Sequence, residues 1–252
     1  MQLKLTDNAK VKFRKKHYNT FGLLHGFTNN GGTCQGATIG PGGCMEPNKL
    51  KKLVDGEEVD SKNSLCYMDK FVRVRPSVRK ALVHNTELLR PLNKAELIKL
   101  LSEAVDEFLR LNDGLDPFFR LHYSGDFYSD TYAKAWVEVV NKYPDVTFWA
   151  YTRSFKYIRY FADIKNITIY LSADPVNQRE AFIIYEKYKK SPNVGISWMG
   201  NNPPDSKKYR WVVCPEISGK LKNTEDKGAC AKCRLCINNY HDKVKNVQFQ
   251  LH

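Results

Sequence analysis

The sequence predicts an α/β fold with a partial (β/α) barrel-like parallel sheet, an irregular N-terminal region rich in Cys and Gly, and a C-terminal Cys-rich module. The main observation is that short apolar runs alternate with helical segments between residues 117 and 198. Such an alternation indicates βαβ units and a parallel sheet. A second observation is that 42% of the 252 residues are hydrophobic, which is enough for a sizeable buried core.

Two helices are expected before the alternating region begins, over residues 77–90 and 93–112. In the second, apolar residues recur at three-and-four spacing from Leu97 to Leu111, which is typical of an amphipathic face. Asn93 stands at the N-cap position of this helix.

Strands and helices then follow in turn. The expected strands are PFFRLHYS, VTFWAYT, ITIYLSA and VGISW, and the expected helices between them cover residues 129–143, 154–163 and 177–190. Ser129 and Ser154 stand where N-caps belong, and Pro144 and Pro192 lie where helices should end. RWVVC at 210–214 and NVQFQL at 246–251 are candidates for further strands.

We interpret the chain, residues 1–252, as a single domain with three regions. Residues 1–75 are expected to form an irregular cluster-binding region with a glycine-rich loop from Gly31 to Gly43. Residues 76–213 form the β/α core, and residues 214–252 form a four-cysteine module.

The chain is strongly basic, with 40 Lys and Arg against 27 Asp and Glu and a formal net charge of +13. A positive field attracts phosphates, so nucleic acid or a nucleotide is the expected partner. The runs KVKFRKKHY at 10–18 and FVRVRPSVRK at 71–80 are either phosphate-binding or ordinary solvated surface. No apolar run approaches roughly eighteen residues and the first residues are charged, so we expect a cytoplasmic protein without a membrane span.

Polar side chains stand at every expected strand exit. In parallel sheets the carboxyl ends of the strands carry the ligand-binding loops, so these residues are candidates for a site. Turn and cap formation is an alternative role for Ser172, Asp174 and Ser197. The candidates are His122, Ser124, Gly125, Asp126, Arg153, Ser172, Asp174 and Ser197.

The C-terminal cysteines follow the pattern C-x15-C-x2-C-x2-C, formed by Cys214, Cys230, Cys233 and Cys236. Successive two-residue gaps are typical of iron–sulfur ligation, whereas zinc sites more often separate two C-x2-C pairs. We therefore expect a four-thiolate [4Fe-4S] cluster, with zinc as the alternative metal.

The N-terminal cysteines, Cys34, Cys44 and Cys66, have the irregular spacing C-x9-C-x21-C. Three thiolates on a four-iron cluster leave one iron free for a small-molecule ligand, and the glycines around them would let backbone approach a cluster closely. Buried free cysteines in a glycine-rich loop are the alternative interpretation.

Several segments together resemble a known family. They are CQGATIGPGGC around Cys34, the Cys66-Tyr67 pair, HYSGDFYSDTYAKAWVEVVNKYPDVTFWAYTRS, and the terminal CP with CAKCRLC. In these the chain resembles the phage and prophage gene-product-88-like proteins from about residue 30 to residue 240. That family distantly resembles radical S-adenosylmethionine (SAM) enzymes, whose partial β/α barrels hold a three-cysteine cluster near the carboxyl edge of the sheet.

The second resemblance implies roles for particular residues. Cys34, Cys44 and Cys66 match the cluster ligands, and Ser124-Gly125-Asp126 resembles the turn that holds the SAM amino group. Arg153 and Ser172 would meet the SAM carboxylate or ribose. The cysteine spacing departs from the usual C-x3-C-x2-C pattern of radical SAM enzymes.

Three functional hypotheses follow. The first is a radical SAM-like enzyme with two [4Fe-4S] clusters, supplied by an electron donor and acting on nucleic acid or a nucleotide. Its catalytic residues are His122, Asp126 and Arg153, and its cofactor-binding residues are Ser124, Gly125, Asp126, Arg153, Ser172, Asp174 and Ser197. The second is a non-catalytic nucleic-acid-binding phage protein, in the host cytoplasm, stapled by Fe–S or Zn centres. The third is a metal-dependent nuclease that uses Asp126, Asp174 and His122.

Overall fold

The alternating region folds into neighbouring parallel strands, as the sequence predicts. The structure is a computed structural model that describes residues 2–12, 17–45, 52–54, 57–59, 65–205, 207–237 and 246–250. Four strands follow one another across the sheet, each parallel to the next. They are β5 (Phe118–Arg120), β6 (Thr147–Thr152), β7 (Ile167–Ala173) and β8 (Val194–Met199).

Further strands extend the sheet on both sides, to the order β1-β2-β5-β6-β7-β8-β10-β9. β10 (Asn246–Phe249) and β9 (Trp211–Val213) confirm the two strands expected late in the chain, and both pair in parallel. β2 (Tyr18–Thr20) pairs with β5 in parallel, whereas β1 (Thr6–Asp7) pairs with β2 antiparallel.

Two expectations about this architecture need correction. The sheet order ends at β1 and at β9, so the structure shows a mostly parallel sheet and no barrel-like closure among the described residues. The expected irregular region over 1–75 also contains regular structure: β1, β2, the antiparallel pair β3 (Lys52–Val54) and β4 (Glu57–Val59), and α1 (Tyr67–Val74). These strands are two or three residues long, which is too short to show a period in the sequence.

Helices α2 (Pro76–Leu89), α3 (Lys94–Leu111) and α4 (Asp130–Lys142) lie where they are predicted. Asn93 caps α3 in a capping box with Glu96, and the Ser129 side chain accepts from the backbone N–H of Tyr132. Ser154 stands at the N-cap position as predicted, but its side chain makes no capping hydrogen bond. Its hydroxyl donates to the carbonyl of Phe127 (2.9 Å), and the helix after it is short: η2 (Phe155–Tyr157) and α5 (Ile158–Phe161).

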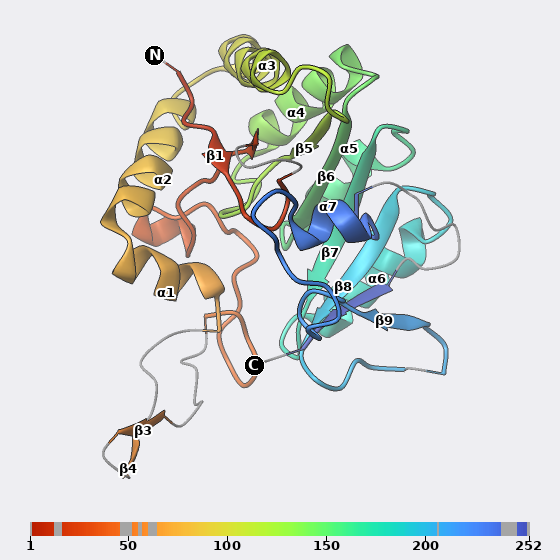
Figure 1. Cartoon of the computed structure of the whole chain (residues 1–252). Helices are drawn as coiled ribbons and strands as arrows, with labels where there is room; N and C mark the ends of the chain where they lie inside the picture. Colours follow the sequence, from red (N-terminus) through yellow and green to blue (C-terminus); the bar gives the residue numbers. More distant parts are fainter. Residues whose placement is uncertain are drawn as a thin grey trace.

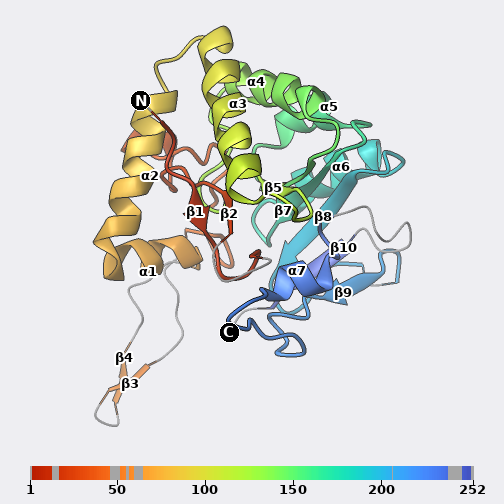
Figure 2. The same ribbon diagram turned by 45° about the horizontal axis from the view of Figure 1, so that its top comes forward.

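The two faces of the sheet differ in what covers them. On one face, Phe119 and Phe148 pack with Trp136 of α4 in a large core that also includes residues of α3, α5 and α6 (Gln178–Tyr188). On the other face, Phe118 and Trp149 pack with Ile237, which follows α7 (Ala229–Cys233). Figures 1 and 2 show α4, α5 and α6 together on one side of the sheet, with α7 apart from them. The C-terminal module thus covers the face that the other helices leave open.

The remaining described elements are α1 and α2, which lie side by side at the β1 end of the molecule (Figures 1 and 2), and the short η1 (Thr28–Asn30). No helix in the described part of the chain is long and apolar enough to cross a membrane.

Candidate functional site

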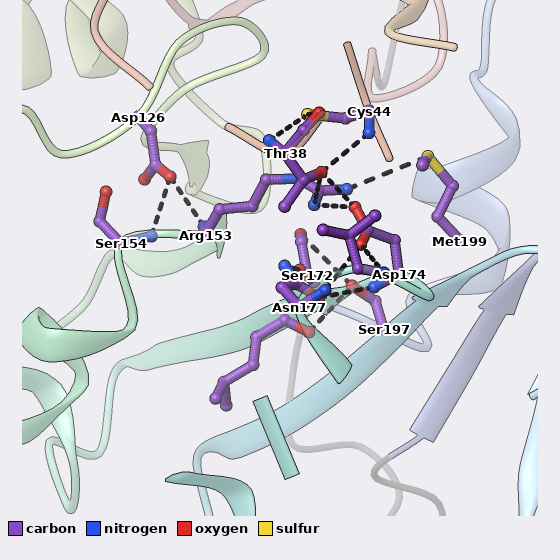
Figure 3. A network of polar contacts seen from close by, with 12 residues as sticks. Thr38, Cys44, Asp126, Arg153, Ser154, Ser172, Asp174, Asn177, Ser197 and Met199 are labelled. Atoms are coloured by element: carbon purple, nitrogen blue, oxygen red, sulfur yellow. Dashed lines mark hydrogen bonds and ion pairs between the residues drawn. The ribbon is translucent and has the colours of Figure 1, made fainter. Parts of the chain in front are cut away.

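The glycine-rich loop lies over the carboxyl ends of β6 and β7. Arg153, just after β6, forms an ion pair through Nη1 with Oδ2 of Asp174, just after β7. The Asp174 side chain is fully buried and the Arg153 side chain is 13% exposed. The Asp174 carboxylate also accepts backbone N–H bonds from Val176 and Asn177 through Oδ1, so one carboxylate organises the turn and holds the cation (Figure 3).

Thr38 connects this ion pair to the first cysteine region. Its hydroxyl donates to Oδ2 of Asp174 (2.6 Å) and accepts from Nη1 of Arg153 (3.3 Å) and from the backbone N–H of Cys44 (2.9 Å). The backbone N–H of Thr38 donates to Sγ of Cys44 (3.4 Å). One threonine therefore fixes a cysteine relative to the sheet edge, as Figure 3 shows.

Close packing requires glycine at two positions of this loop. A Cβ on Gly36 would lie 2.0 Å from the carbonyl oxygen of Arg153, so the loop backbone rests directly on the sheet edge. Gly42 has a φ of +82°, and a Cβ there would meet the ring of Pro175 at 2.7 Å. Gly36 thus allows a close backbone approach to the end of β6, whereas the expected approach of glycines to a cluster stays a prediction.

The structure brings the three N-terminal cysteines near one another. The backbone N–H of Cys66 donates to the carbonyl of Cys44 (2.7 Å). Burial raises the pKa of the Cys34 thiol, and the charges of Asp126, Cys66 and Cys44 add to the effect. Burial also raises the pKa of Cys66, again with a contribution from Cys44. We call these three thiols the first thiol set.

The four C-terminal cysteines also lie together, and we call them the second thiol set. Burial raises the pKa of Cys236, and charges on Cys230, Cys214 and Cys233 raise it further. Burial raises the pKa of Cys230 to about 11, a shift that Arg120 opposes and Cys214 reinforces. The set therefore gathers one thiol that follows β9, two from α7 and one just beyond α7.

Two tyrosines from the sheet contact the second thiol set. Burial raises the pKa of Tyr151 and Tyr170, and the charge of Cys236 raises both further. The Tyr170 hydroxyl donates to the carbonyl of Leu235 (3.4 Å), one residue before Cys236. Their rings stack at 5.4 Å, and the Arg120 guanidinium lies 5.3 Å from the Tyr151 ring centre. The set is thus enclosed by aromatic side chains from the face of the sheet that α3 to α6 leave open.

Among the described residues, no group of three or more His, Cys, Asp or Glu side chains is arranged to hold a metal ion. A single zinc ion needs its sulfur ligands at about 2.3 Å from the metal. A four-iron cluster instead binds each thiolate through a different iron. The cluster and zinc sites expected at the two thiol sets therefore stay predictions.

The carboxylate of Asp126 is occupied by four donors from its own surroundings. Oδ1 accepts from the Phe127 N–H (2.7 Å) and the Thr152 hydroxyl (2.7 Å). Oδ2 accepts from the backbone N–H groups of Arg153 (2.7 Å) and Ser154 (3.1 Å). Burial raises the pKa of this carboxyl, whereas these hydrogen bonds lower it. Asp126 therefore fixes the backbone that carries Arg153.

The Ser124-Gly125 turn is engaged with the N-terminal segment. The Ser124 hydroxyl donates to the carbonyl of Leu23 (2.9 Å). Gly125 has a φ of +78°, and a Cβ there would lie 2.4 Å from the Thr33 hydroxyl, which accepts from the N–H of Asp126. The turn thus anchors the chain one residue before Cys34.

His122 lies apart from the charged residues at the sheet edge. Its ring is buried among Phe21, Phe127 and Trp136, and Nε2 pairs with the Tyr132 hydroxyl at 2.8 Å. Burial, with a smaller contribution from Arg120, lowers its pKa to about 3. The expectation that His122 faces a substrate does not agree with this placement, because the side chain turns into the apolar core.

Ser172 and Ser197 lie on adjacent strands at the carboxyl end of the sheet, near Asp174 (Figure 3). Their hydroxyls are 3.5 Å apart, and that of Ser197 also donates to the carbonyl of Leu171 (3.3 Å). Ser172 is half-buried and Ser197 is buried.

Thr38, Met199, Arg120 and Tyr170 were not predicted as site residues, whereas Tyr151 stands at an expected strand exit. Thr38 stands 136 residues from its partner Asp174, and no local pattern indicates such a contact. Arg120 could have been noticed as a charge within the apolar run PFFRL. The alternation of faces along β6 places Tyr151 on the same side as Trp149, and Tyr170 of β7 pairs in register with Tyr151.

Comparison with known proteins identifies the family of this chain. The family model described as "Gene product 88" matches residues 2–239. The chain belongs to the Gene product 88 family. It is 37% identical over 181 residues to the Gene 88 protein of Mycobacterium phage L5, which covers 69% of this chain and 74% of the relative. The Gene 88 protein of Mycobacterium phage D29 is 35% identical over 183 residues, with the same coverage.

These matches support the expected likeness to phage gene-product-88 proteins. They leave the resemblance to radical SAM enzymes without support, and no solved structure matches the chain. The function of this Gene product 88 protein must therefore be inferred from its own residues.

Proposed function

We propose that this protein is an iron–sulfur enzyme of the radical SAM type with two centres. Cys34, Cys44 and Cys66 would hold a four-iron cluster with one open iron, and the second thiol set would hold an auxiliary cluster. The observation that carries the proposal is that hydrogen bonds tie all three cysteine segments to the carboxyl edge of a parallel sheet. Thr38 joins Cys44 to Arg153, the N–H of Cys66 donates to the carbonyl of Cys44, and Thr33, one residue before Cys34, accepts from the N–H of Asp126. Parallel sheets bind ligands at this edge.

The chemistry of the donor groups fits a cationic centre. Burial and mutual proximity raise the pKa of Cys34 and Cys66, so without a cation these thiols stay protonated. A bound metal centre would stabilise the thiolates that burial disfavours. The N–H of Thr38 already points to Sγ of Cys44 and would supply the kind of outer hydrogen bond that tunes such centres.

Arg153 is the residue that we assign to ligand binding. Its Nη1 donates to Asp174 and Thr38, whereas Nη2 contacts Sδ of Met199 at 4.0 Å. Nη2 is thus the donor with capacity for a ligand carboxylate, and Asp174 fixes its direction. When bound and reduced, the open cluster would supply the electron that cleaves the sulfonium of SAM to give a carbon radical.

Other residues of the sheet edge receive positioning roles. We assign Asp126 to holding the backbone of Arg153 and Ser154, and Ser124 with Gly125 to anchoring the loop that leads to Cys34. Ser172, half-buried at the end of β7, is the hydroxyl that we assign to a ligand ribose. His122 receives no catalytic role because its ring is enclosed by the core.

The test is turnover after anaerobic reconstitution. With both centres loaded, addition of SAM and dithionite should release 5′-deoxyadenosine and methionine. Arg153→Met should weaken SAM binding at least tenfold, whereas Arg159→Met, an exposed arginine on α5, serves as the matched control. If the loaded protein neither binds SAM nor releases 5′-deoxyadenosine, the enzyme assignment is wrong.

A second candidate is a metal-stapled nucleic-acid-binding protein without catalysis. The observation that favours it is that the second thiol set joins distant segments. Near it, the N–H groups of Gly228 and Cys230 donate to the backbone carbonyls of Lys12 and Lys10. The N–H of Cys214 donates to the backbone carbonyl of Gln248. A metal there would supply folding energy directly. A colourless protein that contains zinc and unfolds on chelation would favour this candidate.

A further inference from the structure

A basic surface adjoins the first thiol set. Residues 67–80, which form α1 and the start of α2, contain five cations and one acid, Asp69, so this segment contributes +4 to the net charge. We call these cations the α1–α2 basic face. All five side chains are exposed: Lys70, Arg73, Arg75, Arg79 and Lys80.

Among the described residues, only one of these five cations has an acidic partner. Arg73 pairs with Asp69 at 2.9 Å, on side chains that are 54% and 19% exposed. Lys70, Arg79 and Lys80 form no ion pair with any residue in the described part of the chain. Uncompensated cations on one face attract a phosphate backbone and release its counterions.

An exposed aromatic ring stands beside these cations. Tyr67, the first residue of α1, is 61% exposed. Its hydroxyl donates to the carbonyl of Tyr123, which holds the ring in place. Arg75 lies over the partly exposed ring of Phe71, 4.7 Å from its centre. Cations combined with fixed, exposed aromatic rings are typical of surfaces that bind single-stranded nucleic acid, because bases stack on the rings.

The position of Tyr67 links this surface to the candidate site. Tyr67 directly follows Cys66, which is the N-cap residue of α1. Tyr123, which holds its hydroxyl, directly precedes the Ser124-Gly125-Asp126 turn. A base stacked on Tyr67 would therefore lie next to the first thiol set. An enzyme that acts on a base needs that base unstacked from a duplex, which a single strand provides at the lowest energetic cost.

We propose that the α1–α2 basic face docks single-stranded nucleic acid and that Tyr67 stacks a base beside the first thiol set. Docking stands on charge and aromatic exposure alone, whereas the delivery of a base for chemistry rests on the proposed function. Figures 1 and 2 show α1 and α2 at one side of the molecule, away from α6, so this face can be changed separately.

The first test is fluorescence anisotropy of the full-length protein with a labelled single-stranded oligonucleotide of mixed sequence and with its duplex. Lys70→Glu with Arg79→Glu and Lys80→Glu should weaken binding to the single strand at least tenfold. The slope of log affinity against log salt should fall by about 2, because three phosphate contacts are lost. The control, Lys99→Glu with Lys187→Glu and Lys190→Glu, makes the same change of charge on exposed lysines of α3, of α6 and of the turn after α6.

The second test separates stacking from charge. Tyr67→Ala should weaken single-strand binding about tenfold and leave the salt slope unchanged. Tyr67→Phe, which keeps the ring but loses the hydrogen bond to Tyr123, should retain most of the binding. Circular dichroism and melting of each variant establish that it is folded. Equal weakening by the basic-face and control triple variants, or tighter binding to the duplex with no effect of Tyr67→Ala, would overturn the proposal.

Iron content measured on the same samples keeps this test separate from that of the proposed function. Protein that binds the oligonucleotide but takes up no iron refutes the enzyme and leaves the docking surface standing. Protein that is loaded with iron but binds no oligonucleotide refutes the docking surface alone.

Discussion

The two thiol sets differ in their surroundings. The first has charged and hydroxyl side chains around it. The charge of Asp126 acts on Cys34, Arg153 interacts by charge with Cys44, and the Thr38 hydroxyl accepts from the N–H of Cys44. The second is covered by Tyr151 and Tyr170 and tied by backbone hydrogen bonds to the N-terminal segment. The first environment suits ligand binding, and the second suits a closed centre that stabilises the fold or carries electrons. The following predictions test this contrast, from the largest expected effect to the smallest.

Removing cysteines should affect the two sets differently. Cys34→Ser with Cys66→Ser should remove about four of about eight irons and abolish 5′-deoxyadenosine release. Cys230→Ser with Cys233→Ser should remove the same amount of iron and also lower the melting midpoint by roughly 10 °C or more, because a metal that joins distant segments contributes folding energy. Iron assay and calorimetry measure both. Equal loss of stability in the two variants would remove the contrast.

The buried ion pair of the first region should matter more than an ion pair of the second. Asp174→Asn leaves the Arg153 guanidinium without its partner in a buried position and should cost about 3 kcal/mol in the free energy of unfolding. Glu216→Gln removes the exposed pair that Lys10 forms near the second set (2.9 Å) and should cost less than about 1 kcal/mol. Urea denaturation compares them. An Asp174→Asn variant as stable as Glu216→Gln would show that Arg153 is not held by this carboxylate.

The free energy of unfolding should depend on pH through His122, which lies in the main hydrophobic core. Its folded pKa, about 3, lies below its ordinary value of 6.5, so the unfolded state takes up the proton more readily. The related stability is complete above about pH 6.5 and is lost as the pH falls toward 3, with about 2 kcal/mol lost at pH 5. His122→Phe should reduce the dependence between pH 7 and pH 5 by that amount. An unchanged pH profile would contradict the burial of a neutral imidazole.

A methyl group added to the glycine loop should distinguish the two regions by the smallest margin. Gly36→Ala places a Cβ 2.0 Å from the Arg153 carbonyl, so the loop must shift, at a cost of about 2 kcal/mol. A Cβ at Gly219, near the second set, would have no neighbour within 4 Å. Gly219→Ala therefore costs only the backbone strain of a φ of +74°, about 1 kcal/mol in the free energy of unfolding. The free energy of unfolding and the affinity for SAM should both be lower in Gly36→Ala. An unchanged affinity for SAM would show that the glycine loop does not form part of the site.

Most of the sheet could be predicted from the sequence because its strands are apolar and separated by helices of ordinary length. β1 and β2 could not, because strands of two and three residues show no period and form through long-range pairing. β1 pairs with Thr20 of β2, and β2 in turn pairs with Arg120 of β5. The sheet edge was also predictable, since Arg153 and Asp174 follow from the rule that strand ends carry function. The placement of His122 was not, because its ring points into the core just past the end of β5, where the alternation of faces no longer applies.

We propose that the protein has two inorganic centres and that only the first has an open position. Electron paramagnetic resonance of the dithionite-reduced protein, with and without SAM, is the sharpest test of this proposal. We expect two iron–sulfur signals, of which one shifts with SAM and is the one missing from Cys34→Ser. A single signal that SAM leaves unchanged, or no iron–sulfur signal from protein reconstituted under anaerobic conditions, would contradict it.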